Sequence, residues 1–478
     1  MKKQFYSYFM LAVLASHSAL FGTTATTTQH DFYPLHTTLY PFDFLNEQHK
    51  ATIKGMTRHP MAERIRFSAT AFGQKATIGR DQDKVECPAG DIHGRWNMVG
   101  LTYGSVPTGH TLPALLTAAA GQTYQDGQLL SHENYSDVND HLGHFSIPLR
   151  YIKMGARFDF SVRIFSDVVL QVETGIADIK QTHTKFLDQG DPLVYTTAIP
   201  VQDIYGSTTA VADLVADRAT IANWLMDPHE LIFEQMGLNI QDYHATGPED
   251  VLLSLTWRHN FIINKPGSYY DESDDVFNHD NQWSPFIMTP FFKVTGIVGI
   301  GKEKDQTKAF SIPLGNNKHN GVSIATGLSM DFYETIEFTW QAGASHFFKR
   351  DISGMYIPND ERQRGVFPFK TDVSYSPGKT WFFTCGLNAY HFMEKLSFYT
   401  EYIYTSHSKD SIKLITPDTA FKPHVLEDHT KWAVQAMNVG FQYDFSPYMK
   451  VGFTWQLPLV RRGAYKTNTL AVTLAGTF

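Results

Sequence analysis

Apolar and polar residues alternate one by one along many segments of the chain. In the C-terminal segment one face holds Leu470, Val472, Leu474, Gly476 and Phe478, and threonine and alanine fill the other face. Residues 449–457 and 157–164 alternate in the same way, with arginine, lysine, aspartate or glutamine on the polar face. A period of two is typical of a β-strand with one apolar face.

The same period predicts twelve strands of about ten residues or more. They lie near residues 64–74, 145–165, 168–182, 251–263, 285–301, 321–332, 335–346, 380–392, 395–406, 433–445, 448–457 and 468–478. The segments Val366–Tyr375 and Lys50–Met56 could add two more, so fourteen strands is the alternative.

Four pairs of neighbouring strands are joined by very short turns that follow an aromatic residue. These turns fall within Ile164–Val168, Asp331–Thr335, His391–Lys395 and Asp444–Tyr448. If Phe478 ends the last strand on the periplasmic side, all four turns fall on that side too. The pattern predicts short periplasmic turns and long extracellular loops.

Two long insertions lack the alternation, residues 75–144 and 183–250. Helical patterns occur within them near Leu112–Ala120, Thr208–Leu225 and Glu230–Met236. These insertions could constrict or plug a barrel lumen, or form surface loops with a small core of their own, and we favour the surface loops.

The chain starts with the basic residues Lys2 and Lys3, an apolar run and then small residues. This order predicts a secretory signal peptide at residues 1–25 with cleavage within 22–25, and the alternative is a short membrane anchor. Residues 26–63 are expected to form an N-terminal periplasmic segment before a barrel of residues 64–478.

Composition narrows the class of protein. Net charge is −8 without a basic patch, so nucleic acid is not an expected partner. Two cysteines in 478 residues exclude a disulfide framework. No zinc-protease or calcium-loop spacing is present, so we predict no metal, no cofactor and no enzyme activity.

These features together resemble the outer-membrane β-barrels of Gram-negative bacteria, with no single family singled out. The ending that contains Leu474, Gly476 and Phe478 is similar to the C-terminal signal read by the barrel-assembly machinery. The resemblance implies an all-β transmembrane antiparallel barrel in the cell outer membrane. Its implied partners are the lipid bilayer with its lipopolysaccharide, the assembly machinery and small solutes, and a homo-oligomer is compatible with it.

The polar face is the candidate functional surface. The residues predicted to line a pore are Arg64, Arg66, Arg157, Asp159, Arg163, Glu173, Arg258, Lys293, Glu337, Glu401 and Lys450. Such charges either face water in an open lumen or pair with one another and fill a narrow one. About eight strands close on a filled interior and sixteen leave a channel, so twelve strands do not decide between these alternatives.

The favoured function is a porin-like channel for passive diffusion of small hydrophilic solutes. One alternative is a surface structural or adhesive protein that uses the long loops. A less favoured one is a hydrolase embedded in the barrel rim, for which His259 is the sole candidate. His259 alternates with Trp257 and Phe261, which places it on the lipid-facing set.

Overall fold

The computed structural model describes most of the chain. The described residues are 65–97, 99–102, 104–114, 116, 144–165, 167–183, 187–188, 229–263, 286–332, 336–361, 363–393, 395–446 and 449–477. The predicted signal peptide, Arg64 and Phe478 lie outside these ranges.

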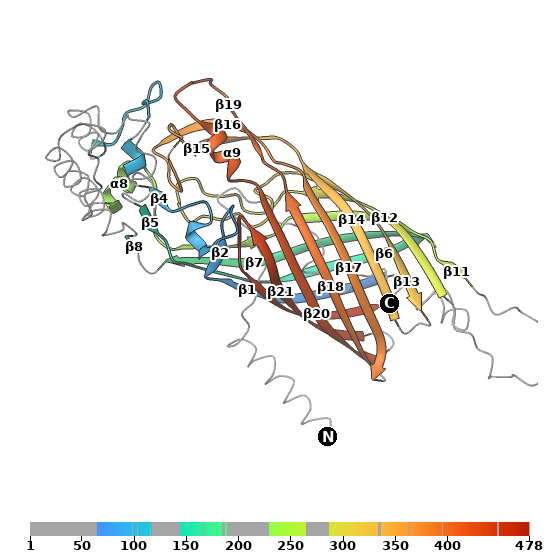
Figure 1. Ribbon diagram of the computed structural model, residues 1–478. Coiled ribbons are helices and arrows are strands. Elements are labelled where there is room, and N and C mark those ends of the chain that lie inside the picture. The colour runs from blue at the N-terminus through green and yellow to red at the C-terminus, as the bar shows by residue number, and fades with distance from the viewer. Residues whose placement is uncertain are drawn as a thin grey trace, which may run out of the picture.

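Twelve long strands form a closed antiparallel ring (Figure 1). They follow one another around the ring in chain order: β1 (Ile65–Ala76), β6 (Leu149–Phe165), β7 (Val168–His183), β10 (Val251–Arg258), β12 (Phe286–Val298), β13 (Gly321–Phe332), β14 (Ile336–Phe347), β17 (Thr380–Met393), β18 (Leu396–His407), β20 (Trp432–Ser446), β21 (Met449–Arg462) and β23 (Asn468–Thr477). The ring closes where β23 pairs with β1 along Arg66–Lys75.

The fourth strand position of the barrel wall is occupied by three shorter strands. The short strands β9 (Tyr243–Pro248) and β11 (Phe261–Ile263) extend β10 at its two ends, because β9 pairs with β7 and β11 pairs with β12. The predicted insertion 183–250 therefore ends earlier than expected, since residues 243–248 belong to the barrel wall.

The prediction of twelve barrel strands is confirmed, and the alternative of fourteen is wrong for the described residues. Val366–Tyr375 does contain most of a strand, β16 (Phe369–Ser376), but it pairs with β15 (Arg350–Ile357) and β19 (Ser411–Leu414) in a separate sheet. The segment Lys50–Met56 lies outside the described residues.

The four predicted turns join β6 to β7, β13 to β14, β17 to β18 and β20 to β21 at one end of the barrel. One expectation for this end is wrong. The connection between β11 and β12 also starts and ends here, yet it spans residues 264–285. Not every connection at the short-turn end is therefore short.

Side chains alternate in exposure along each barrel strand. In β1, Phe67 is 43% exposed, while its neighbours Arg66 and Ser68 are buried. The exposed set around the barrel is apolar and includes Phe160, Leu255, Trp257, Phe292, Ile324, Trp381, Phe441, Phe453, Trp455 and Leu474. The barrel thus has an apolar outer belt and an inner face on which polar groups prevail.

The opposite end carries a cap, by which we mean the described residues of the long connections (Figure 1). It holds three small sheets and two short α-helices. They are β2 (Ile78–Arg80), β3 (Glu86–Pro88) and β22 (Ala464–Tyr465); β4 (Trp96–Asn97), β5 (His144–Ser146) and β8 (Leu187–Asp188); β15, β16 and β19; and α8 (His229–Gln235), α9 (Pro423–Asp428), with the 3₁₀ turns η1 (Ala89–Asp91) and η2 (Val99–Thr102). Within the described part of the chain, no helix is long and apolar enough to span a membrane.

The predicted helices have mixed outcomes. Helix α8 agrees with the pattern near Glu230–Met236. Thr208–Leu225 and most of Leu112–Ala120 lie outside the described residues. Two buried apolar clusters hold the cap together, and both include side chains from the inner face of the barrel.

We predict that Phe453→Arg destabilises the barrel by roughly 2–4 kcal/mol, the cost of an arginine on the lipid face near the bilayer midplane. Phe453 points outward between Phe441 and Val472 of the flanking strands. Urea unfolding in lipid vesicles measures the effect, and Phe453→Leu is the control, expected to change little. Equal stability of the arginine variant would contradict a lipid-facing position.

Candidate functional site

The candidate site is the interior of the barrel. Ten of the eleven predicted pore-lining residues are described, and all ten occupy inward-facing strand positions. Buried among them are Arg66, Arg157, Asp159, Glu173, Arg258 and Glu337; partly exposed are Arg163, Lys293, Glu401 and Lys450. That they line a solute path stays a prediction.

A buried ion-pair cluster lies in the half of the barrel nearer the cap. Glu249, at the junction of β9 and β10, accepts a bond from Lys153 Nζ at 2.5 Å. The same carboxylate accepts bonds from Arg157 Nε at 2.5 Å and from its second nitrogen at 2.8 Å. Gly175 leaves the room for this pairing, because a Cβ there would lie 2.5 Å from Glu249 Oε2. The Arg157 guanidinium also stacks 4.7 Å from the ring centroid of Phe72.

A second network lies closer to the short turns. Gln171 donates to Asp159 Oδ2 at 2.8 Å, and Lys293 Nζ donates to Gln171 at 3.2 Å and to Glu173 at 3.5 Å. Charges of both signs on β6, β7 and β12 therefore meet directly. Of the two alternatives left open by the sequence, paired charges that fill the interior fit this arrangement.

Polar contacts continue around the ring. Asn438 donates to Glu401 at 2.9 Å and accepts a bond from Gln456 at 3.0 Å. On another wall, Glu337 accepts hydrogen bonds from Ser329 and Tyr390. Inward polar side chains thus form several hydrogen-bonded groups around the ring, as buried polar groups tend to do.

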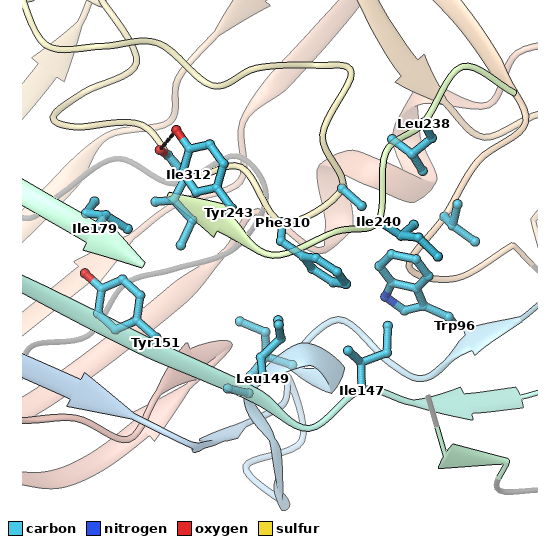
Figure 2. Packing of buried hydrophobic residues seen from close by; sticks show 14 of the residues in the cluster. Trp96, Ile147, Leu149, Tyr151, Ile179, Leu238, Ile240, Tyr243, Phe310 and Ile312 are labelled. Carbon is cyan, nitrogen blue, oxygen red and sulfur yellow. Dashed lines mark hydrogen bonds between the residues drawn. The ribbon is translucent and has the colours of Figure 1, made fainter. Parts of the chain in front are cut away.

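The cap closes the mouth of the barrel. Residues 299–320, which connect β12 to β13, fold inward over β7 and β9, and Tyr243 of β9 donates its hydroxyl to the carbonyl of Ile312 at 3.3 Å. Figure 2 shows Ile312 beside Tyr243 and near Ile179 of the barrel wall, and Phe310 beside Trp96. The rings of Trp96 and Phe310 stack at 5.9 Å.

One carboxylate ties this inward loop to the wall. Asp250 accepts hydrogen bonds from the Gly301 amide at 2.9 Å and from the Asn316 amide and side chain at 2.5 and 2.7 Å. A second apolar cluster, with Leu252, Ile297 and Phe347 from the wall, covers the mouth from the other side. The last part of the insertion 183–250, which the structure describes from residue 229, shares its core with the barrel, since α8 contributes Ile232 and Phe233 to the same cluster as the wall residues.

The interior below the cap is also enclosed. Inward side chains from separate walls are almost inaccessible to solvent, including Ser68, Ser254, Ser323, Thr384, Tyr399, Asn438, Thr454 and Gln456. Neighbouring side chains therefore cover these hydroxyl and amide groups.

The histidine considered for catalysis lies elsewhere. His259 is at the short-turn end, 45% exposed in its side chain, with Nδ1 2.9 Å from Asp167 and its ring against Phe261. A hydroxyl–imidazole–carboxylate chain does occur in the cap end of the wall, where His407 lies 2.8 Å from both Thr380 and Asp410. It is buried, and Trp432 stacks on the imidazole, so a substrate has no access to the hydroxyl.

Glu249 and Asp250 were missed in the sequence. They fall in a stretch taken as insertion, and each binds partners far away along the chain. The signal that could have found them is the alternation of Tyr243, Ala245 and Gly247 just before, which continues the wall. Among the described residues no three histidine, cysteine, aspartate or glutamate side chains gather as a metal site.

The closed twelve-stranded ring, apolar outside and polar inside, defines an outer-membrane β-barrel protein. Within hydrocarbon every backbone amide and carbonyl must be paired, and a closed barrel is the one sheet that achieves this. Leu474 faces outward on the last strand and Gly476 pairs with Phe67 and Met449. Their role in assembly stays a prediction, and Phe478 lies outside the described residues.

No protein-family model matches the chain, and no curated protein sequence matches it. Solved structures of similar architecture include the COG4313 outer membrane channel from Pseudomonas putida F1, with 8% identity and a TM-score of 0.44 over 87% of this chain and 96% of that one. The Pseudomonas putida toluene transporter TodX is 10% identical, with a TM-score of 0.30 over 94% and 96%. The translocator domain of autotransporter NalP from Neisseria meningitidis is 7% identical, with a TM-score of 0.30 over 92% and 97%. At these TM-scores the likeness carries no functional weight.

We predict that Glu249→Gln costs about 3–5 kcal/mol of stability, because it leaves Lys153 and Arg157 as uncompensated buried cations. The thermal unfolding of the folded barrel in detergent, followed by its gel mobility, measures the loss. The control is Lys466→Gln, which breaks the exposed pair with Glu86 and is expected to cost little stability. A loss no larger than that of the control would show that the cluster does not hold the wall.

The cap also contains two neighbouring histidines. The rings of His93 and His429 meet edge to face at 5.7 Å. Burial, followed by the nearby positive charge of Arg364, lowers the pKa of His429 to about 4, and burial lowers the pKa of His93 as well. Both rings are therefore neutral in the folded cap at neutral pH.

This shift predicts a pH dependence of the cap. Between an unfolded pKa of 6.5 and the folded value of about 4 for His429, the opened cap takes up a proton that the folded cap does not. Cap stability is therefore constant above about pH 6.5 and falls as the pH is lowered through this window. Hydrogen exchange of residues 421–430, corrected for intrinsic rates, measures it. His429→Gln should make the profile shallower, with His93 supplying the part that remains, and an unchanged profile would contradict the assignment.

Proposed function

We propose that this protein is an outer-membrane channel for small hydrophilic solutes, with a mouth that its own loops close. The observation that carries the proposal is the polar interior, where charged, amide and hydroxyl side chains from strands all around the ring face one another. Such groups offer a permeating solute hydrogen bonds in place of water.

The solute class follows from the same groups. TodX and CymD are described as a toluene transporter and a monoaromatic hydrocarbon channel. A hydrocarbon solute does not suit this interior, because it would have to break paired charges without replacing their bonds. A small polar or charged molecule can exchange places with them. The ten inward residues named above, among them Lys293 and Glu401, would then line the path.

Closure is proposed to be reversible. The loop 299–320 is held by Asp250, by hydrogen bonds with Arg350 and Phe348, and by apolar contacts, and it carries no covalent tie to the wall within the described residues. Displacing this loop would remove Phe310 and Ile312 from the mouth. The basal channel should therefore conduct little, and weakening the attachment should increase conductance.

The test is ion conductance in planar bilayers. Asp250→Ala removes three hydrogen bonds to the loop and should raise the frequency of open events several-fold. Lys318→Ala is the matched control, because it breaks an exposed ion pair between two residues of the same loop, Lys318 and Glu303, and should leave conductance unchanged.

Two outcomes would contradict the proposal. One is a folded Asp250→Ala barrel that stays electrically silent under all voltages and solutes. The other is a wild-type barrel that already conducts as a wide, permanently open pore. Heat-modifiable gel mobility confirms that each variant is folded before it is measured.

A surface-binding function is the second candidate, favoured by the cap's own architecture. The sheet β15–β16–β19 and helix α9 pack into a cluster around Phe369, Tyr375 and Phe421, which gives the cap a defined shape. Removing residues 408–428 should then abolish attachment to a surface while the barrel still assembles. Loss of conductance control without loss of attachment would favour the channel instead.

We also propose that a signal peptide at residues 1–25 exports the protein and that residues 26–63 form a periplasmic segment. We further propose assembly through Leu474, Gly476 and Phe478, and association into a homo-oligomer.

A further inference from the structure

The outer face of the barrel carries a row of cationic side chains at one height. Lys75 of β1 and Lys180 of β7 both pair in register with Ile152 of β6, which lies between them. Lys180 in turn pairs with His244 of β9. Arg150 lies two positions further along β6 towards the cap. These four side chains and Ile152 occupy outward-facing positions, and Arg150, Lys180 and His244 are exposed.

This row marks the edge of the apolar belt. On the membrane side of it, Met154 is 46% exposed and Ile176 is 56% exposed. On the other side the strands run into the cap. Asp178, on β7 at this edge, has oxygens 2.5 Å from His244 and 3.8 Å from Lys180. A second carboxylate, the exposed Asp242, comes immediately before β9, two residues on the cap side of His244. Three lysine and arginine charges thus lie beside two carboxylates at the edge of the apolar belt.

We infer that this row, formed by Lys75, Arg150 and Lys180, binds the phosphate groups of a phosphorylated glycolipid in the outer leaflet. The two halves of the surface match the two halves of such a lipid. Acyl chains lie along the exposed apolar residues Met154 and Ile176, and phosphates meet the cations just above. Cations beside an anionic membrane surface strengthen binding through this same charge complementarity.

The spacing suits more than one phosphate. Lys75 and Lys180 are two strands apart, which is roughly 10 Å at the usual distance between strands. Two separate phosphate groups on one headgroup can therefore each meet a lysine. Arg150, between them and nearer the cap, can bridge with two parallel N–H···O bonds. Asp178 contacts His244 and Lys180, and none of its described contacts is with Arg150.

The test uses the full-length folded barrel and three probes. Native mass spectrometry from detergent micelles measures binding of bisphosphorylated lipid A, of the same lipid without phosphates, and of inorganic phosphate. The variant combines Lys75→Gln, Arg150→Gln and Lys180→Gln. At about fivefold per cation, the three substitutions together should lower the lipid A affinity by roughly 100-fold.

A matched control removes the same charge from the cap. It combines Lys84→Gln, Lys302→Gln and Lys413→Gln, three exposed lysines away from the belt edge, and should keep wild-type affinity. Equal lipid A affinity in the row variant and the wild type would overturn the assignment. So would equal affinity for the dephosphorylated lipid, or competition by inorganic phosphate alone. The conductance of the row variant should stay at the wild-type level, so this test is independent of the channel proposal.

Discussion

The structure depends on one constraint, the pairing of every backbone amide and carbonyl of the wall inside hydrocarbon. An open sheet leaves two edges unpaired, and each unpaired group costs several kcal/mol there. This chain removes both edges by pairing its last strand with its first, from Arg66↔Thr477 to Lys75↔Asn468. Closure then dictates the alternation, because successive residues of each strand must face lipid and interior in turn.

The interior follows from that alternation and adds a second constraint. Charges turned inward leave bulk water, so they need partners, and Glu249 supplies one for Lys153 and Arg157 together. When inward charges pair in this way, their side chains occupy the interior of the barrel. Transport through it requires that solute and water take over these bonds, and the loop 299–320 must leave the mouth first.

Much of the wall could be predicted from the sequence, because the signal is local. Phe453 and Trp455 alternate with Thr454 and Gln456, and this pattern alone fixes which side each faces. The pairing of Glu249 with Arg157, or of Asp250 with Asn316, joins residues far apart in the chain and has no local signature. The cap was harder still, since Trp96, Phe233 and Phe310 reach one cluster from three separate connections.

The central claim is a wall whose alternate residues face lipid and an enclosed polar interior. Spin labels placed singly along residues 67–71, with Cys87 and Cys385 replaced by serine, measure contact with oxygen in the lipid and with a water-soluble nickel complex. We predict oxygen contact at Phe67, Ala69 and Ala71, and little contact with either reagent at Ser68 and Thr70. Free access of the nickel complex to Ser68 and Thr70, or a profile without a period of two, would contradict it.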